Sequence, residues 1–175
     1  MPRSPIRPSR RSIRLPNVDY SQGGTYFLTI CSFDKTNIFG EVRNNIVHLN
    51  PIGEIVRDLW LAIPTHFPTI RLHAFILMPN HLHGIVAIEE WARHAVPLQI
   101  ARNVEGFQNP VSASIPTMVR SFKSAVTKHV RSHMNIPSIQ VWQSNYFERI
   151  LRNGTELRHA TRYITENPRR WMTRK

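Results

Sequence analysis

The sequence predicts an α+β domain in which an antiparallel sheet carries its helices on one face. Apolar, β-branched runs at residues 25–33, 70–78 and 81–88 are typical of strands. Segments 50–63 and 115–133 instead repeat their apolar residues at helical spacing. These segments alternate along a chain of 175 residues, a length that fits one domain with a single buried core.

The first strand, residues 25–33, precedes a small hairpin. That hairpin covers residues 38–49 and turns at Asn44–Asn45, a pair that favours tight β-turns. The first helix follows directly. Asn50 is its expected N-cap and Pro51 its first helical residue, and both types are favoured at those positions.

Pro64 is expected to end the first helix. Strands 70–78 and 81–88 come next, joined by a tight turn at Pro79–Asn80. Residues 89–113 show no clear period and are expected to form a long loop.

The second helix, residues 115–133, is expected to bury its apolar face. A short strand is predicted at residues 139–142. Asn153-Gly-Thr-Glu156 resembles a capping box, and the last helix that it starts is expected to end before Pro168. The order of elements is the ferredoxin-like β-α-β-β-α-β arrangement with an appended C-terminal helix. Both earlier helices would pack on one side of the sheet, leaving the other face open for a ligand.

The charge of the chain indicates a polyanionic partner. Lys and Arg number 23 against 11 Asp and Glu, a net charge of +12. Nucleic acid is favoured over an anionic membrane surface or a protein that is merely basic. Residues 1–18 are expected to be a flexible basic arm, and residues 19–175 a single catalytic domain. The arm contributes Arg10, Arg11 and Arg14 as candidate DNA contacts.

Cysteine content and hydropathy limit the location of the protein. Cys31 is the single cysteine, so neither an intramolecular disulfide nor a cysteine-based zinc site can form. The N-terminus lacks the apolar core of a secretory signal, and no apolar run reaches the ~20 residues that span a bilayer. We therefore expect a cytoplasmic, nucleoid-associated protein with no membrane partner.

His81 and His83 are the most informative pair in the chain. They occupy alternate positions of strand 81–88, so both imidazoles lie on one face while Leu82 faces the core. Two imidazoles one step apart on a rigid strand can share a metal ion. Histidines also alternate on a strand whose outer face is simply wet, so the pair alone leaves both interpretations open.

The last helix carries a second set of polar residues. Tyr163 and Asn167 are four residues apart and share one face, and His159 lies one turn earlier on it. A phenol can attack phosphorus if it loses its proton and the phosphate charge is neutralised, which a divalent cation does. His159 is a candidate proton carrier or a structural residue at a DNA surface. Tyr163 and Asn167 also fit a packing tyrosine and a helix-terminal asparagine.

Four segments carry a resemblance to a known family. They are Leu77–Val86, Val119–Ala125, Trp142–Glu148 and Tyr163–Pro168. In order and in motif they resemble the single-tyrosine HUH transposases of the insertion-sequence transposase superfamily, and among them the REP-associated tyrosine transposases. The resemblance covers residues 20–171.

The resemblance implies metal-dependent cleavage and rejoining of single-stranded DNA next to hairpins. The intermediate would be a 5′-phosphotyrosine, formed with release of a 3′-hydroxyl. His81 and His83 match the HUH pair, Tyr163 the nucleophile, and Asn167 the third metal ligand. The cofactor would be Mg²⁺ or Mn²⁺, and a site with two histidines suits Mn²⁺ at least as well. We expect a monomer rather than a homodimer.

Basic and aromatic residues are candidates for holding the DNA. Single strands are bound by cations along the phosphates and by aromatic faces against the bases. The candidate phosphate contacts in the domain are Arg120, Lys123, Lys128, Arg152 and Arg162, and the candidate stacking residues are Trp142, Tyr146 and Phe147. Two alternatives stay open: a hairpin-DNA-binding regulator without strand transfer, and a phosphodiesterase that uses metal-activated water.

Overall fold

The structure of the protein is a computed structural model, and residues 23–89 and 114–172 are described. Its centre is a four-stranded antiparallel sheet of order β4-β5-β1-β6. The strands are β1 (Gly24–Cys31), β4 (Ile70–Met78), β5 (His81–Ile88) and β6 (Phe147–Leu151). Together with the crossing helices, this order is the predicted ferredoxin-like arrangement. The α+β fold class is therefore confirmed.

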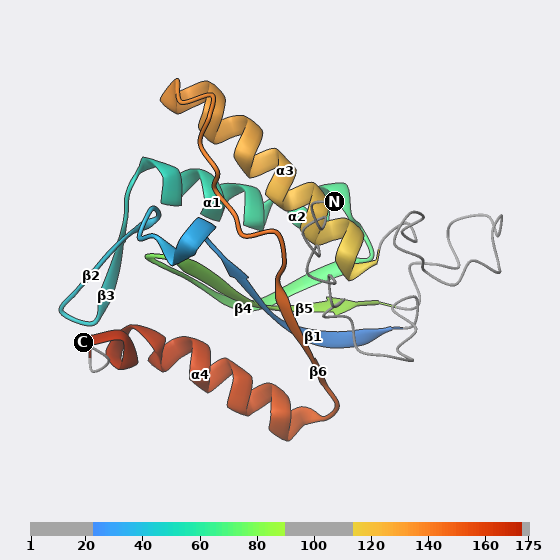
Figure 1. The fold of residues 1–175 in the computed structure, drawn as a ribbon. Coiled ribbons are helices and arrows are strands. Elements are labelled where there is room, and N and C mark those ends of the chain that lie inside the picture. The colour runs from blue at the N-terminus through green and yellow to red at the C-terminus, as the bar shows by residue number, and fades with distance from the viewer. Residues whose placement is uncertain (1–22, 90–113, 173–175) are drawn as a thin grey trace, which may run out of the picture.

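Helices cover both faces of this sheet (Figure 1). α1 (Pro51–Leu61) and α3 (Ile115–Met134) lie on one side, and α4 (Gly154–Met172) lies on the other. The expectation that the second face stays open for a ligand is wrong. The reason is that α4 has an apolar side of its own, which it buries on that face.

The alternation of side chains in β1 explains why both faces are covered. Leu28 and Ile30 join the large core under α1 and α3, whereas Phe27 joins a smaller cluster with Ile85 and Ile164 of α4. A strand whose two sets of side chains are both apolar must be covered on both sides. This second, smaller core fixes α4 against the sheet.

The close approach of α1 to the sheet requires a glycine. Gly84 of β5 faces the fully buried Trp60, and a Cβ at this position would overlap the Trp60 ring. Trp60 also packs edge-on against Phe122 of α3, with ring centroids 5.3 Å apart. β5, the strand that carries both histidines, is therefore held from behind by a tightly packed aromatic side chain.

The predicted hairpin and helix start are confirmed. Strands β2 (Gly40–Arg43) and β3 (Ile46–Leu49) pair around Asn44 and Asn45, which have φ values of 52° and 60°. Asn50 accepts a hydrogen bond from the Gly53 amide at 2.9 Å. The chain then ends α1 at Leu61 and forms one further short helix, α2 (Ile63–His66), with Pro64 in its first turn. A 3₁₀ turn, η1 (Phe33–Lys35), follows β1.

The predicted strand at residues 139–142 is wrong. Within it, only Trp142 forms an isolated bridge, to Ser32, and the fourth strand of the sheet is β6 instead. Trp142 is held by the core, where its ring packs against Phe39 and Phe122. β6 is an edge strand with charged residues on it, so its sequence lacks the apolar run that marks the inner strands.

The predicted end of the last helix before Pro168 is also wrong. Half of the capping box forms: Asn153 Oδ1 accepts from the Glu156 amide at 3.0 Å, but the Glu156 carboxylate accepts from the Arg152 amide at 3.3 Å rather than from that of Asn153. α4 then continues through Pro168 to Met172. Pro168 is buried and costs the helix one backbone hydrogen bond. Packing of the final turn, in which Trp171 lies against His81 at 5.8 Å between ring centroids, offsets that loss.

Several expectations fall outside the described residues. They are the basic arm with Arg10, Arg11 and Arg14, and all but the first residue of the loop 89–113. The boundary between arm and domain stays a prediction. Among the described helices, none combines the length and the hydropathy needed to cross a bilayer.

Candidate active site

The two histidines of β5 lie side by side on the face covered by α4. Their ring centroids are 4.5 Å apart, and His83 is 6% exposed while His81 is half-buried. Leu82, between them, points into the core on the other face. The alternation of a strand thus gives two imidazoles on one surface, as the sequence predicts.

Hydrogen bonds orient both imidazoles through the same nitrogen. His83 Nδ1 lies 2.9 Å from Thr29 Oγ1, and His81 Nδ1 lies 2.6 Å from Asn80 Oδ1. Asn80 Nδ2 donates to the Lys35 carbonyl, which turns the amide oxygen toward His81. His81 Nδ1 therefore carries the proton and donates it, so its basic nitrogen is Nε2. Such partners fix the tautomer and orientation of metal-binding histidines.

α4 brings the tyrosine and the asparagine to this pair. The Tyr163 ring lies edge-on to His83 at 5.2 Å between centroids, with Phe27 beside both rings. Asn167 is 6% exposed. A cavity of about 20 Å³ is lined by His81, Tyr163, Asn167, Arg170 and Trp171. Residues more than 80 positions apart in the chain thus meet at one small site.

His159 lies apart from this cavity. It is exposed on α4, one turn before Tyr163, and does not line the cavity. Its neighbours Leu157 and Ala160 pack against the sheet instead. The structure therefore gives His159 a place on the surface next to the site, and its catalytic role stays a prediction.

Two residues of the last turn of α4 were missed by the sequence analysis. The Arg170 guanidinium carbon lies 5.6 Å from the centre of the Tyr163 ring, and Trp171 packs on His81. Tyr163, Asn167 and Trp171 recur every four residues, which marks one helix face. That signal was hidden by the assumption that the helix ends before Pro168.

An ion-pair network holds Arg170. Arg170 Nη2 donates to Glu166 Oε2 at 2.7 Å, and Arg162 Nε donates to Glu166 Oε1 at 2.9 Å. These two hydrogen bonds lower the pKa of the Glu166 carboxyl. The carboxylate is therefore flanked by two guanidinium groups along the exposed side of α4, one of them at the cavity.

The donor set suits a divalent ion. Within residues 23–89 and 114–172, no cluster of three His, Cys, Asp or Glu side chains is found, so a third protein ligand beside the two imidazoles would be the Asn167 amide oxygen. Two nitrogens and one oxygen leave coordination positions for phosphate oxygens. This combination fits Mn²⁺ or Mg²⁺ held jointly by protein and substrate.

The predicted phosphate contacts do not form one cluster. Arg120 and Lys128 are exposed on α3, and Arg152 and Arg162 are exposed beside or on α4, across the sheet (Figure 1). Lys123 is the exception, because its ammonium is directed inward. A role in DNA binding stays a prediction for each of them.

The Lys123 ammonium binds the backbone of the segment before β6. It donates to the carbonyls of Gln143, Ser144 and Asn145 at 2.6, 3.3 and 3.1 Å. Burial lowers its pKa from 10.5 to about 8. Lys123 therefore ties α3 to the chain that leads into the edge strand.

The chain has sequence relatives among known proteins. No family model matches it. It is 40% identical over 164 residues to an uncharacterized protein of Haemophilus influenzae, covering 93% of this chain and 89% of that protein. It is also 22% identical over 150 residues to a protein of the same organism described as "Putative REP-associated tyrosine transposase", covering 86% and 73%. By sequence, this chain is therefore similar to a putative REP-associated tyrosine transposase.

The fold agrees with that similarity. A solved REP-associated tyrosine transposase, bound in its structure to a REP hairpin, matches with a TM-score of 0.56 at 17% identity. The match covers 85% of this chain and 68% of that one. The α+β fold, with its antiparallel sheet and C-terminal helix, therefore matches that of a solved transposase.

Proposed function

We propose that this protein is a REP-associated tyrosine transposase that cleaves and rejoins single-stranded DNA beside a hairpin, with Tyr163 as the nucleophile. One observation carries the proposal: Tyr163 and Asn167 of α4 line the same cavity as His81 of β5. The hairpin bound by the solved REP-associated tyrosine transposase supports a hairpin substrate.

The Tyr163 oxygen would attack a phosphorus atom of the backbone and form a 5′-phosphotyrosine. The bond from phosphorus to the 3′-oxygen breaks, the phenol loses its proton, and the 3′-oxygen gains one. In the reverse step the 3′-hydroxyl of a DNA strand attacks the phosphotyrosine and restores the phenol. Each step exchanges one phosphate ester bond for another, so no external energy source is needed.

His81, His83 and Asn167 would hold the divalent ion, which supplies neutralisation of a phosphate oxygen when bound. The protein's own part is orientation. Thr29 and Asn80 fix the two imidazoles through Nδ1, and the second core fixes α4. The reacting phosphorus would thereby be held between the Tyr163 oxygen and the histidine pair.

Arg170 is placed to contact the same phosphate. Its guanidinium lies beside the Tyr163 ring and at the cavity, and Glu166 holds it from the other side. A guanidinium matches phosphate geometry and stays charged at all working pH values. We propose that it stabilises the charge of the pentacovalent transition state.

We also propose that the protein acts as a monomer in the cytoplasm, on DNA of the nucleoid. The tyrosine and the histidines meet within one chain, so no second copy is needed to complete the site. This arrangement supports cleavage in cis.

The test incubates the protein with a labelled single-stranded oligonucleotide that contains a hairpin, in Mn²⁺. We expect a protein–DNA band that survives SDS, is lost with EDTA, and is absent in Tyr163→Phe and His81→Ala. Tyr26→Phe, at a buried tyrosine of the large core on the other sheet face, is the matched control and should keep the band. Hairpin binding without any adduct would favour the regulator instead, and normal cleavage by Tyr163→Phe would favour the water-based phosphodiesterase.

A further inference from the structure

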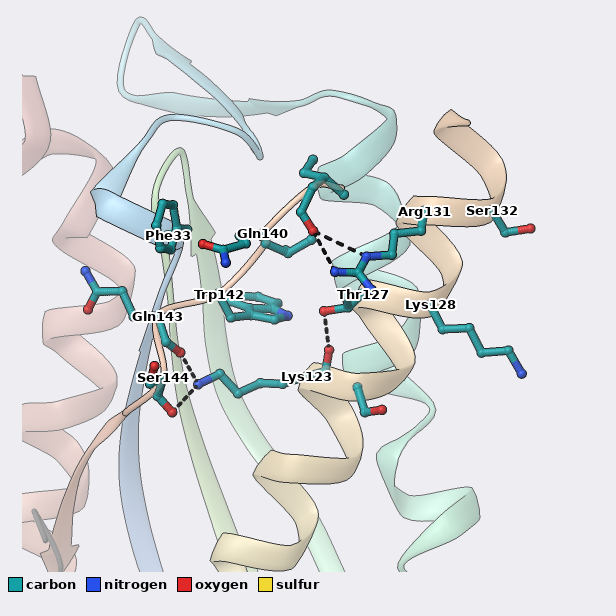
Figure 2. A pocket seen from close by; sticks show the side chains of 13 residues that line it. Phe33, Lys123, Thr127, Lys128, Arg131, Ser132, Gln140, Trp142, Gln143 and Ser144 are labelled. Carbon is teal, nitrogen blue, oxygen red and sulfur yellow. Dashed lines mark hydrogen bonds between the residues drawn. The ribbon is translucent and has the colours of Figure 1, made fainter. Parts of the chain in front are cut away.

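A second, larger depression lies on the other face of the protein, between α3 and the segment 139–144 (Figure 2). Its volume is about 850 Å³, against about 20 Å³ for the cavity at Tyr163. Lys123, Lys128 and Arg131 line it from α3, and Phe33 lines it from the far side. We call it the α3 groove.

The charge of the α3 groove is of one sign. Its described lining contains three cations and neither Asp nor Glu. Arg131 uses Nε and Nη2 on the Ile139 carbonyl at 3.4 and 3.3 Å, and a guanidinium has further N–H donors to offer. Lys128 forms no ion pair with any described residue, and its ammonium extends outward (Figure 2). Cations gathered without acids attract a polyanion.

The rim of the α3 groove adds an aromatic face. Phe33 is 40% exposed, an unusually high fraction for an aromatic ring that lies close to the large core. Apolar residues Ile139, Val141 and Trp142 also line the groove, and the rest of the lining is hydroxyl and amide side chains: Ser124, Thr127, Ser132, Gln140, Gln143 and Ser144. Exposed aromatic rings beside cations and hydrogen-bonding groups are the features by which proteins hold single-stranded nucleic acid.

The sheet connects the α3 groove to the tyrosine site. Cys31 is the register partner of His81, and its carbonyl accepts from the Gln143 amide at 3.1 Å. The groove wall is thus one strand away from the histidine pair at the same end of the sheet. Along the edge between them, Phe147 is 55% exposed and shares the register partner Thr29 with His83, so it lies on the histidine face.

We propose that the α3 groove binds a single-stranded DNA segment that flanks the linkage attacked by Tyr163, after that strand passes around the β6 edge at Phe147. Phosphates would lie on Lys128 and Arg131, and a base would stack on Phe33. The inference rests on the proposed function for the nature of the ligand. The basic lining disfavours a basic peptide, and an acidic peptide is the competing occupant that the experiment must exclude.

The test uses the whole chain and fluorescence anisotropy of labelled (dT)20 in a salt series. The variants are Lys128→Ala with Arg131→Ala, Lys128→Ala alone, and Phe33→Leu. The matched control is Arg57→Ala with Arg71→Ala, which removes the same charge from α1 and the far edge strand. Melting curves check that each variant is folded. Adduct formation on the hairpin oligonucleotide is followed separately at saturating DNA.

We expect the groove double variant to raise the Kd about tenfold and to lower the slope of log K against log salt by about 1.4, because each lost phosphate contact removes about 0.7. Lys128→Ala alone should lower the slope by about half as much. Phe33→Leu should raise the Kd by about fivefold or more through lost stacking. The control should change both quantities far less, and unlabelled poly-glutamate should not displace (dT)20.

Two results separate this inference from the proposed function. If groove variants bind (dT)20 as the wild type does while Tyr163 forms its adduct, the groove inference is overturned and the function stands. If no adduct forms but groove variants lose (dT)20 binding as expected, the tyrosine chemistry fails and the α3 groove stands as a DNA-binding site.

Discussion

Replacement of Thr29 by valine removes a hydrogen bond that orients His83 and leaves the proposed metal ligands themselves unchanged. Thr29 Oγ1 lies 2.9 Å from Nδ1 of His83, whose side chain is 6% exposed. Valine keeps the shape of the side chain and removes the hydroxyl. The imidazole would then lose its fixed orientation and tautomer, while Nε2 and the rest of the donor set remain.

The expected fall in metal affinity follows from the loss of this hydrogen bond. Removal of such a supporting hydrogen bond typically costs about 10- to 100-fold in metal affinity. A tenfold rise in Kd equals about 1.4 kcal/mol, which is the amount by which stabilisation at saturating metal falls. In a domain of this size 1 kcal/mol shifts the Tm by about 2–4 °C, so the rise in Tm on adding Mn²⁺ should shrink by about 3–6 °C.

The assay is thermal unfolding with and without Mn²⁺, backed by calorimetric titration of the ion. Thr25→Val is the matched control, because Thr25 lies on the same face of β1 but is the register partner of Ala87 rather than a histidine. Equal Mn²⁺ affinity in Thr29→Val and wild type would refute the reasoning that these imidazoles hold an ion through Nε2.

Three further predictions concern packing, charge and catalysis. Gly84→Ala should destabilise the protein by about 1–3 kcal/mol in urea unfolding, because its Cβ would overlap Trp60. Gly24→Ala should cost less, because the nearest atom to its Cβ, on the Tyr26 ring, is 3.2 Å away. Burial lowers the pKa of Lys123 from 10.5 to about 8, so between these pH values the unfolded chain binds more protons than the folded chain and the free energy of unfolding should rise with pH. Lys123→Met should abolish this part of the rise, and a pH slope that stays as in the wild type would contradict the prediction. Arg170→Gln should slow adduct formation about 10- to 100-fold with little change in DNA Kd, while Arg169→Gln, its exposed neighbour, should not.

The inner part of the fold could be predicted because its signals are local. β5 alternates around Leu82, the hairpin turns at Asn44–Asn45, and Asn50 caps α1, all within short stretches of sequence. The pairing of His81 with His83 on one face follows from the period of a strand alone. These features need no knowledge of distant contacts.

The failures lie where distant contacts decide the outcome. β6 is an edge strand that pairs with β1, and its charged sequence does not predict a strand. α4 runs through Pro168 because its last turn docks on the sheet, which local propensity does not show. Arg170 and Trp171 were missed for that reason, as was the covering of the second sheet face.

The identity of the modified residue is the most direct measurement. After reaction with a hairpin oligonucleotide in Mn²⁺, the adduct would be digested with nuclease and protease and its peptides sequenced by mass spectrometry. A nucleotide phosphate attached to the phenolic oxygen of Tyr163 is the predicted result. Attachment to another residue, or DNA cut with every peptide unmodified, would contradict the account.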